Sequence, residues 1–300
     1  MKRLFAILLS LTALSTTPAQ AVLNVLACEP EWAALTQELT GDKAKVTSAT
    51  TAMQDPHHIE ARPALIAQAR RADMLVCTGA ELEIGWLPLL QRESGNADIQ
   101  SGQPGYFEAA SAVRLLEKPA VLDRAMGDVH AAGNPHLHLD PHNIMKVAEV
   151  LAKRFADIDP ANAAYYAARH KAFAARMQTA ITRWEKEGAG LRGMPIVVHH
   201  KNWLYLAEWL GLKIVADLEP KPGIDPSATY LGQLLDKLKA QPAKMVLRAA
   251  YQSPKASEWI AERAGVKTVE LPYTVGGSDK AKDLFSLFDD TLARLTEAVR

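Results

Sequence analysis

Two regions in which short strands alternate with helices flank one long alanine-rich segment, and this arrangement most constrains the fold. The segment, residues 160–188, is rich in strong helix formers, begins at Pro160 and ends at Gly188, so we expect one uninterrupted helix. At a rise of about 1.5 Å per residue, such a helix is roughly 40 Å long. A rod of that length can run from one lobe of a protein to another.

Apolar, β-branched runs predict the strands on either side of this rod. They cover residues 22–28, 44–50 and 73–79 before it, and residues 194–200, 212–218, 243–250 and 266–272 after it. Strands that alternate with helices form parallel sheets covered on both faces. We therefore predict an α/β fold of two lobes, each with a mainly parallel β-sheet flanked by helices, joined by one long α-helix. The expected parts are a signal peptide at 1–21, an N-terminal lobe at 22–150, a linking helix region at 151–190 and a C-terminal lobe at 191–300.

The first residues have the three-part pattern of a secretory signal. Lys2 and Arg3 precede an apolar run from Leu4 to Leu14, and "AQA" closes the segment at Ala21. This run is shorter than the roughly 20 apolar residues of a membrane span. We therefore expect the segment to be removed and the chain to be exported to the periplasm.

Charge excludes nucleic acid as a partner. The full chain has 34 basic and 34 acidic residues, and loss of Lys2 and Arg3 with the signal segment leaves a slight acidic excess. Binding to nucleic acid needs a strongly basic face.

Cys28 and Cys77 are the only cysteines, and both end apolar runs that are expected to be strands. In an exported protein they could form a disulfide or stay as two buried thiols, and the sequence leaves both open. A lipid anchor on Cys28 is disfavoured, because this residue lies beyond the apolar run of the signal and inside the first expected strand.

Most of the 9 histidines are crowded into three clusters. These are His57 and His58 in "QDPHHIEARP", His136, His138 and His142 in "NPHLHLDPH", and His199 and His200 in "IVVHHKNW". Neutral imidazole is the commonest protein ligand of zinc, and ligands of α/β folds gather beyond the carboxyl ends of strands. A single histidine is usually a surface or core residue, but three clusters spread over two lobes predict one shared metal site.

The three clusters resemble the ligand motifs of a known family, the periplasmic zinc- and manganese-binding receptors of bacterial ABC importers, also called the cluster A-I metal receptors. "DPHHIEARP" is similar to the first motif of the family, "NPHLHLDP" to the second and "HHKNWLYLAEWLGL" to the third. The resemblance covers the chain after residue 21, including "DPANAAYYAARHKAF" in the long helix. It implies two lobes joined by one helix, a bound metal ion and a membrane permease as partner.

Carried over residue by residue, the motifs imply that His57, His136 and His200 are metal ligands. Many relatives have a carboxylate near "MVLRAAYQSP", but Ala249 stands at that position. The resemblance then leaves Asp279 of "GGSD" as the fourth ligand, on a loop that its glycines allow to bend. Three imidazoles and one carboxylate match tetrahedral Zn²⁺, whereas Mn²⁺ favours more oxygen ligands.

The other clustered histidines, His58, His138, His142 and His199, are expected beside the site or on the surface. Asp55 and Asp140 are expected to accept hydrogen bonds that orient rings or loops. His130 is the only trace of the long histidine-rich loop that zinc receptors of this family often carry.

We therefore expect a periplasmic receptor, not an enzyme, that captures Zn²⁺, with Mn²⁺ as the other candidate, and delivers it to an ABC importer permease. We expect it to act as a monomer and to need no other cofactor. The long helix implies local ordering of loops rather than wide closure of the lobes. Acid should weaken metal binding, because protons compete for imidazoles near their usual pKa of about 6.5.

Two other functions stay open on the sequence. "HLHLDPH" resembles the His-x-His-x-Asp-His run of zinc-dependent hydrolases with one residue inserted, but no separate acid/base pair or nucleophile motif accompanies it. An exported adhesion or interaction protein could instead hold zinc as a structural ion. Such a protein retains its metal, whereas a transport receptor must release it.

Overall fold

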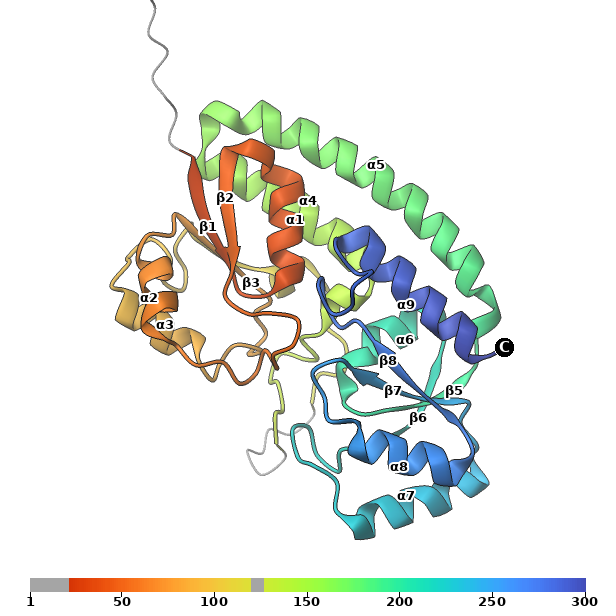
Figure 1. Cartoon of the computed structure of the whole chain (residues 1–300). Coiled ribbons are helices and arrows are strands. Elements are labelled where there is room, and N and C mark those ends of the chain that lie inside the picture. The colour runs from red at the N-terminus through yellow and green to blue at the C-terminus, as the bar shows by residue number, and fades with distance from the viewer. Residues whose placement is uncertain (1–21, 120–126) are drawn as a thin grey trace, which may run out of the picture.

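The computed structural model describes residues 22–119 and 127–300 as two α/β lobes joined by one long helix (Figure 1). Each lobe has a four-stranded parallel sheet, with strand order β2-β1-β3-β4 in the first and β6-β5-β7-β8 in the second. The predicted fold class is confirmed. No helix within the two described ranges has the length and apolar character needed to cross a membrane. The expected signal peptide at 1–21 lies outside the described residues.

The predicted strands and the predicted long helix occur in the expected order, and short 3₁₀ helices (η) lie between the elements. The first lobe contains β1 (Leu23–Ala27), α1 (Pro30–Thr40), η1 (Gly41–Lys43), β2 (Ala44–Ser48), α2 (Pro63–Arg70), β3 (Met74–Cys77), α3 (Leu87–Ser94), β4 (Tyr106–Glu108), η2 (Ala109–Ala112), η4 (Leu137–Leu139) and α4 (Pro141–Ile158). The linking region contains η5 (Pro160–Asn162), α5 (Ala163–Glu187) and η6 (Gly188–Leu191). The second lobe contains β5 (Pro195–Val198), η7 (Lys201–Trp203), α6 (Leu204–Leu210), β6 (Lys213–Asp217), α7 (Ala228–Ala240), β7 (Met245–Ala249), α8 (Pro254–Ala264), β8 (Lys267–Leu271) and α9 (Leu284–Ala298).

The linking helix α5 has 25 residues and lies along both lobes (Figure 1). Phe173, Met177 and Trp184 recur at helical spacing and are fully buried on its inner face. Each such side chain contributes roughly 1.5–3 kcal/mol when it leaves water. Nε1 of Trp184 also donates to Oδ1 of Asp289 in α9 at 2.6 Å. The helix is therefore fastened to the second lobe as well as to the first.

The lobes share one hydrophobic core. A single cluster of buried side chains covers the inner faces of both sheets and includes residues of α1, α4, α5, α6 and α9. Separate clusters fill the outer faces, under α2 and α3 in the first lobe and under α7 and α8 in the second. Because separation of the lobes would expose the shared core to water, the fold supports small movements of loops better than wide opening.

One strand, β4, was not predicted. It has only 3 residues, too few to show an alternating pattern. Pairing with β3 holds it in the sheet, with Leu75 opposite Tyr106 and Cys77 opposite Glu108. Its extended form therefore depends on a tertiary contact more than on its own sequence.

Cys28 and Cys77 form a disulfide, and their Cα atoms are 4.7 Å apart. Cys28 directly follows β1 and Cys77 ends β3, and these strands are parallel neighbours, so their ends meet. Both side chains are fully buried. The alternative that the sequence left open is settled in favour of the disulfide, which also leaves Cys28 no thiol for a lipid anchor.

Candidate metal centre

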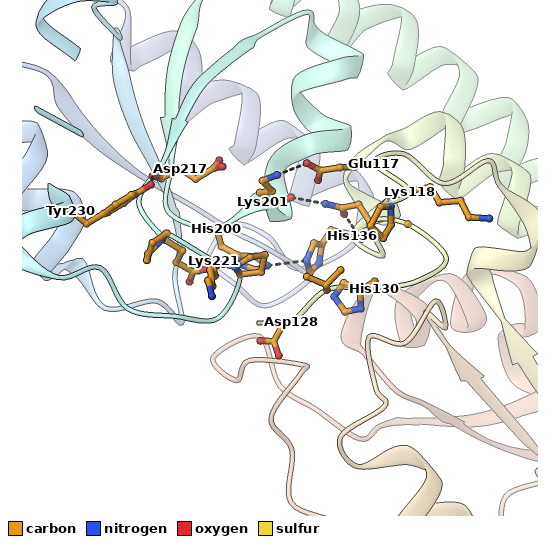
Figure 2. Close-up of a pocket in the computed structure, with 17 residues that line it drawn as sticks. Glu117, Lys118, Asp128, His130, His136, His200, Lys201, Asp217, Lys221 and Tyr230 are labelled. Carbon is orange, nitrogen blue, oxygen red and sulfur yellow. Dashed lines mark hydrogen bonds and ion pairs between the residues drawn. The ribbon is translucent and has the colours of Figure 1, made fainter. Parts of the chain in front are cut away.

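Three of the four predicted ligands converge between the lobes. One nitrogen from each ring of His57, His136 and His200 lies within 4.8 Å of the other two. The three residues are 7%, 1% and 6% exposed. Nε2 of His136 is 3.3 Å from Nε2 of His200 (Figure 2). Two nitrogens that bind one tetrahedral zinc ion at about 2.0–2.1 Å lie roughly 3.4 Å apart, so this pair already has the spacing of metal ligands.

His57 is held by the loop that follows β2. Its Nδ1 lies 2.7 Å from Oδ1 of Asp55, and its backbone N–H donates to the same oxygen at 3.0 Å. Nε1 of Trp86 donates to the carbonyl of Pro56 at 2.8 Å, which ties the loop to the segment after β3. Burial alone would raise the pKa of Asp55, but the hydrogen bond and charge of His57 lower it to about 2. An ionised carboxylate only accepts, so Nδ1 of His57 carries the proton and Nε2 presents a lone pair.

His200 lies at the carboxyl end of β5 in the second sheet. Its Nδ1 is 2.6 Å from Oε2 of Glu219, which follows the neighbouring parallel strand β6. The same oxygen accepts the backbone N–H of Gly223 at 2.8 Å, which keeps the carboxylate in place. Glu219 thus orients His200 as Asp55 orients His57, with Nε2 free to bind a metal.

His136 is fixed by contacts with the second lobe. Its Nδ1 lies 2.7 Å from the hydroxyl of Tyr273, and its backbone N–H donates to Oδ1 of Asn134 at 3.0 Å. Nδ2 of Asn134 donates to the carbonyl of Lys201 at 2.9 Å, and the hydroxyl of Tyr205 donates to the carbonyl of Asn134 at 2.7 Å. The Asn-Pro turn therefore joins the segment that carries His136 to the residues that follow His200.

A fourth ring, His130, adjoins these three. Its Nε2 is 3.3 Å from Nε2 of His57. Burial, reinforced by the neighbouring His57 and His200, lowers the pKa of His130 to about 3, and burial followed by the same neighbours lowers that of His136 well below its usual value. Both rings are therefore neutral at pH 7 and can bind a cation. We call the four rings of His57, His130, His136 and His200 the imidazole group.

His130 was not predicted to lie in the site. It lies in none of the three motifs, and it was expected only as a remnant of a histidine-rich loop a few residues before His136. The structure brings it to His57, which is 73 positions away along the chain.

Asp279 is not brought to the imidazole group. It is exposed, on the loop between β8 and α9. Among the described residues, the group of donor atoms that contains His57 has only His136 and His200 as further members. The segment after β8 contributes Tyr273 instead, which the sequence did not single out because a lone tyrosine has no characteristic spacing. Asp279 as a ligand stays a prediction that requires its loop to move.

Two other clustered histidines have partners outside the imidazole group. His138 is fully buried, with Nε2 2.9 Å from a backbone carbonyl and Nδ1 3.2 Å from Oε1 of Glu31. Nδ1 of His142 is 2.9 Å from Oδ1 of Asp140, which also accepts the backbone N–H of His142 and caps α4. The histidines of "HLHLDPH" therefore do not converge on one ion, as those of a zinc hydrolase would have to do.

Two cavities border the imidazole group. The larger has a volume of about 400 Å³ and includes His130, His136 and His200 in its lining (Figure 2). The smaller has a volume of about 230 Å³ and includes His57 and His200. The two remaining clustered histidines, His58 and His199, line the smaller cavity.

Comparison with known proteins gives one family match and several relatives. Residues 25–298 match the family described as zinc-uptake complex component A, periplasmic. The high-affinity zinc uptake system protein ZnuA of Bacillus subtilis (strain 168) is 24% identical over 269 residues, which are 88% of this chain and 82% of that protein. The manganese ABC transporter substrate-binding lipoprotein scaA of Streptococcus gordonii is 28% identical over 173 residues, which are 58% of this chain and 53% of that protein.

Solved structures share the same architecture. A crystal structure of ZnuA has a TM-score of 0.77 at 24% identity, with 93% of this chain and 100% of that chain covered. An Mn-bound periplasmic metal-binding protein from Candidatus Liberibacter asiaticus has a TM-score of 0.75 at 17% identity, with the same shares covered. These likenesses show that the fold of two lobes and a linking helix is common to all three proteins.

Proposed function

Because this chain belongs to the zinc-uptake complex component A family of periplasmic proteins, we propose that it captures Zn²⁺ between its lobes and delivers the ion to the membrane permease of an ABC importer. The histidine motifs predicted this family, and its members are metal-binding receptors rather than enzymes. In this proposal the chain works in the periplasm as a monomer, after removal of residues 1–21.

The orientation of the imidazoles carries the proposal. In each of the three motif histidines, Nδ1 is bonded to an oxygen of a neighbouring side chain. Two of these oxygens belong to carboxylates, which can only accept, and the phenol of Tyr273 can accept in the same way. The Nε2 lone pairs that remain face other nitrogens at 3.3 Å in two pairs, His57 with His130 and His136 with His200. Because Nδ1 of His136 and of His200 each has an oxygen partner, their Nε2 lone pairs face one another and repel, and a cation between them removes the repulsion.

The donor set favours zinc over manganese. Imidazole suits Zn²⁺, whereas Mn²⁺ prefers carboxylate, carbonyl and water oxygens. We propose His57, His136 and His200 as three ligands. His130, whose Nε2 is 3.3 Å from that of His57 but which lies outside this group of donor atoms, becomes the fourth if its ring moves closer to His136 and His200. Asp279 takes the place of His130 only if the loop after β8 moves toward the site.

Metal analysis and competitive zinc titration of the exported chain test this function. We expect one tightly bound zinc ion per wild-type chain, and a large loss of affinity in His57→Ala, His136→Ala and His200→Ala. Zinc affinity that is unchanged in two of these three variants contradicts the ligand set. Titration with Mn²⁺ against bound zinc tests the choice of metal, and displacement of zinc by Mn²⁺ at similar concentration argues against it.

Two further variants decide the fourth ligand. If His130→Ala weakens zinc binding and Asp279→Ala does not, the fourth ligand is His130. The reverse result assigns Asp279 and implies that its loop closes on the metal.

Release of zinc separates a receptor from a protein that holds zinc structurally. A receptor should lose its zinc to excess chelator, remain folded and bind zinc again when the chelator is removed. Zinc that cannot be removed without unfolding the chain indicates a structural ion and contradicts the transport function.

A further inference from the structure

We propose that Zn²⁺ reaches the imidazole group through the cavity of about 230 Å³ and binds first to an outer site formed by His58 and Asp128 at that cavity. This inference rests on the proposed function, because it describes how the ion arrives at the metal centre. It concerns two residues that are not ligands in the final complex.

The geometry of His58 and Asp128 suits a shared cation. The two residues come from different loops, and Nε2 of His58 is 3.6 Å from Oδ2 of Asp128. Nitrogen and oxygen ligands of one tetrahedral zinc ion, at about 2.0–2.2 Å each, lie roughly 3.4 Å apart. The side chains are 65% and 33% exposed, so a hydrated ion can reach them from solvent. The pair can therefore bind zinc with little rearrangement and complete its coordination with water.

The outer site lies close to the metal centre. His58 directly follows His57 in the chain, and the centroids of their rings are 6.1 Å apart. Both rings line the same cavity. An ion that leaves the outer site therefore needs to move only a short distance to reach the first buried ligand.

The charges around the two cavities show which of them attracts a cation. The described lining of the smaller cavity has four carboxylates and no lysine or arginine: Asp55, Asp128, Glu219 and Asp225. The larger cavity shares Asp128 and Glu219 with the smaller one and also has four carboxylates in all, but it is lined by three lysines as well: Lys118, Lys201 and Lys221 (Figure 2). A cleft lined by one sign of charge raises the local concentration of the opposite ion and speeds its binding. The smaller cavity is therefore the favourable access route for Zn²⁺.

A buried imidazole on the wall of the smaller cavity gives independent support. His199 is 4% exposed, and its Nδ1 has no hydrogen-bond partner among the described residues. A buried polar atom without a partner is unfavourable, so it usually meets water or a ligand. His199 also lies next to His200 in the chain, at the inner end of the proposed route.

Rapid-mixing measurements of zinc binding test the outer site. The proteins are the exported wild-type chain, His58→Ala, Asp128→Asn and the double variant, with a chromogenic chelator as reporter of free zinc. His142→Ala is the matched control, because its ring is 42% exposed beside a carboxylate but lies outside the cavity. We expect the association rate constant to fall about tenfold in the double variant and severalfold in each single variant. The association rate constant of His142→Ala should stay within about twofold of the wild-type value.

Dissociation provides the decisive second measurement. Loss of a site that zinc occupies only in transit slows association and dissociation by the same factor. Release of zinc into excess chelator should therefore slow as much as binding does, while Kd stays constant. An unchanged association rate in the double variant would show that His58 and Asp128 are only a surface ion pair, and would overturn the proposal. So would a weaker Kd with faster release, since that result makes one of them a ligand of the final complex.

A fall in association rate for Asp128→Asn but not for His58→Ala would also overturn the outer site, because it indicates attraction by charge without coordination. Failure of the proposed function looks different from all of these results. In that case the wild-type chain itself does not bind zinc, or His136→Ala binds it as tightly as wild type.

Discussion

The protein has two buried clusters of titratable side chains near the carboxyl ends of its strands, one of imidazoles and one of carboxyl groups. They differ in whether hydrogen-bond donors of the protein or a metal ion would pair with their lone pairs. One is the imidazole group between the lobes. The other is a pair of carboxyl groups inside the first lobe, Glu29 and Glu83, which are 1% and 2% exposed. Glu83 also lies close to the sulfur atoms of the disulfide. We call Glu29 and Glu83 the carboxyl pair.

The protein itself supplies most of the hydrogen-bond donors of the carboxyl pair, and only Oε1 of Glu29 has no partner among the described residues. Backbone N–H groups of Thr78 and Gly79 donate to Glu83 at 2.8 and 3.1 Å, and the hydroxyl of Thr78 donates to Glu29 at 3.1 Å. Burial raises the pKa of Glu83 to about 7, and burial together with the charge of Glu83 raises that of Glu29 well above its usual value. The pair therefore keeps a proton near neutral pH and can stay buried without a metal.

In the imidazole group burial also disfavours charge, but the free lone pairs converge. The Nδ1 atoms of the motif histidines are bonded, whereas Nε2 atoms face one another at 3.3 Å in two pairs. Two cavities reach the group, so an ion can arrive. The carboxyl pair, which accepts hydrogen bonds from the protein, thus stabilises the first lobe. The imidazole group, whose Nε2 lone pairs converge, is arranged to bind a cation.

The largest expected difference between the clusters is in zinc affinity. His136→Ala should lower it by more than about 100-fold, because loss of a ligand exceeds the 10–100-fold cost of losing a ligand's outer partner. Glu29→Gln should leave it within about twofold, since the carboxyl pair binds no metal in our proposal. Competitive titration with a chelator measures both. Similar losses in the two variants would remove the distinction between the clusters.

A smaller loss is expected from a residue that only orients a ligand. Glu219→Ala should weaken zinc binding about 10–100-fold, because His200 loses the acceptor that holds its Nδ1 proton. Glu185→Ala is the matched control, since this carboxylate also contacts a histidine, His142, but lies on α5 outside both cavities. Equal affinities of Glu219→Ala and wild type would show that the bond to His200 does not prepare the site.

The two clusters should change stability with pH in opposite directions. The pKa of His130 is lowered to about 3, so its contribution is present above the unfolded value of about 6.5 and is lost as pH falls toward 3. The pKa of Glu83 is raised to about 7, so its contribution is present below about 4.5 and is lost as pH rises through 7. Each differing proton changes the free energy of unfolding by at most about 1.4 kcal/mol per pH unit, and by less for the partly exposed His130.

Urea unfolding of the metal-free chain at several pH values checks this contrast. Between about pH 6.5 and 4.5, His130→Ala should lose less stability than wild type. An identical loss in both proteins contradicts the pKa of His130. Zinc should raise the melting temperature more at about pH 7.5 than at about pH 5.5, since ligands must be neutral to bind it.

The smallest effect is expected within the carboxyl pair. Glu29→Gln removes a carboxyl group whose pKa is raised by burial and by the charge of Glu83, so the stability lost between about pH 5 and 8 should shrink by roughly 1 kcal/mol or less. The same urea experiments measure the change. If Glu29→Gln loses more stability above pH 7 than wild type, the shared proton does not reside on Glu29.

Most of the fold could be predicted because its signals are local. The apolar runs that became β1, β3 and β5 and the alanine-rich segment that became α5 are patterns within a few residues or a few turns. The exception, β4, has no pattern of its own and is extended because β3 pairs with it. Likewise α4 crosses the lobe boundary expected at residue 150, because Asp140 caps it and it continues to Ile158. That boundary stays a prediction.

The site could be predicted only in part. The motifs indicated His57, His136 and His200, which the structure brings together. They did not indicate His130, and the same motif reasoning led to Asp279, which the structure leaves exposed on its loop. A fourth donor depends on how a loop folds back over the others, and no short pattern encodes that.

The amino-acid order by itself determined which segments form strands and helices and which three histidines end up at their loops, since these depend on short-range periodicity and on motifs of a few residues. Only the tertiary structure decided the partners: Cys28 with Cys77, His57 with His130, and His136 with Tyr273, which are separated by 49, 73 and 137 positions. Such partners meet because two sheets and one helix pack around a shared core, and packing over that distance leaves no mark in any single stretch of the chain.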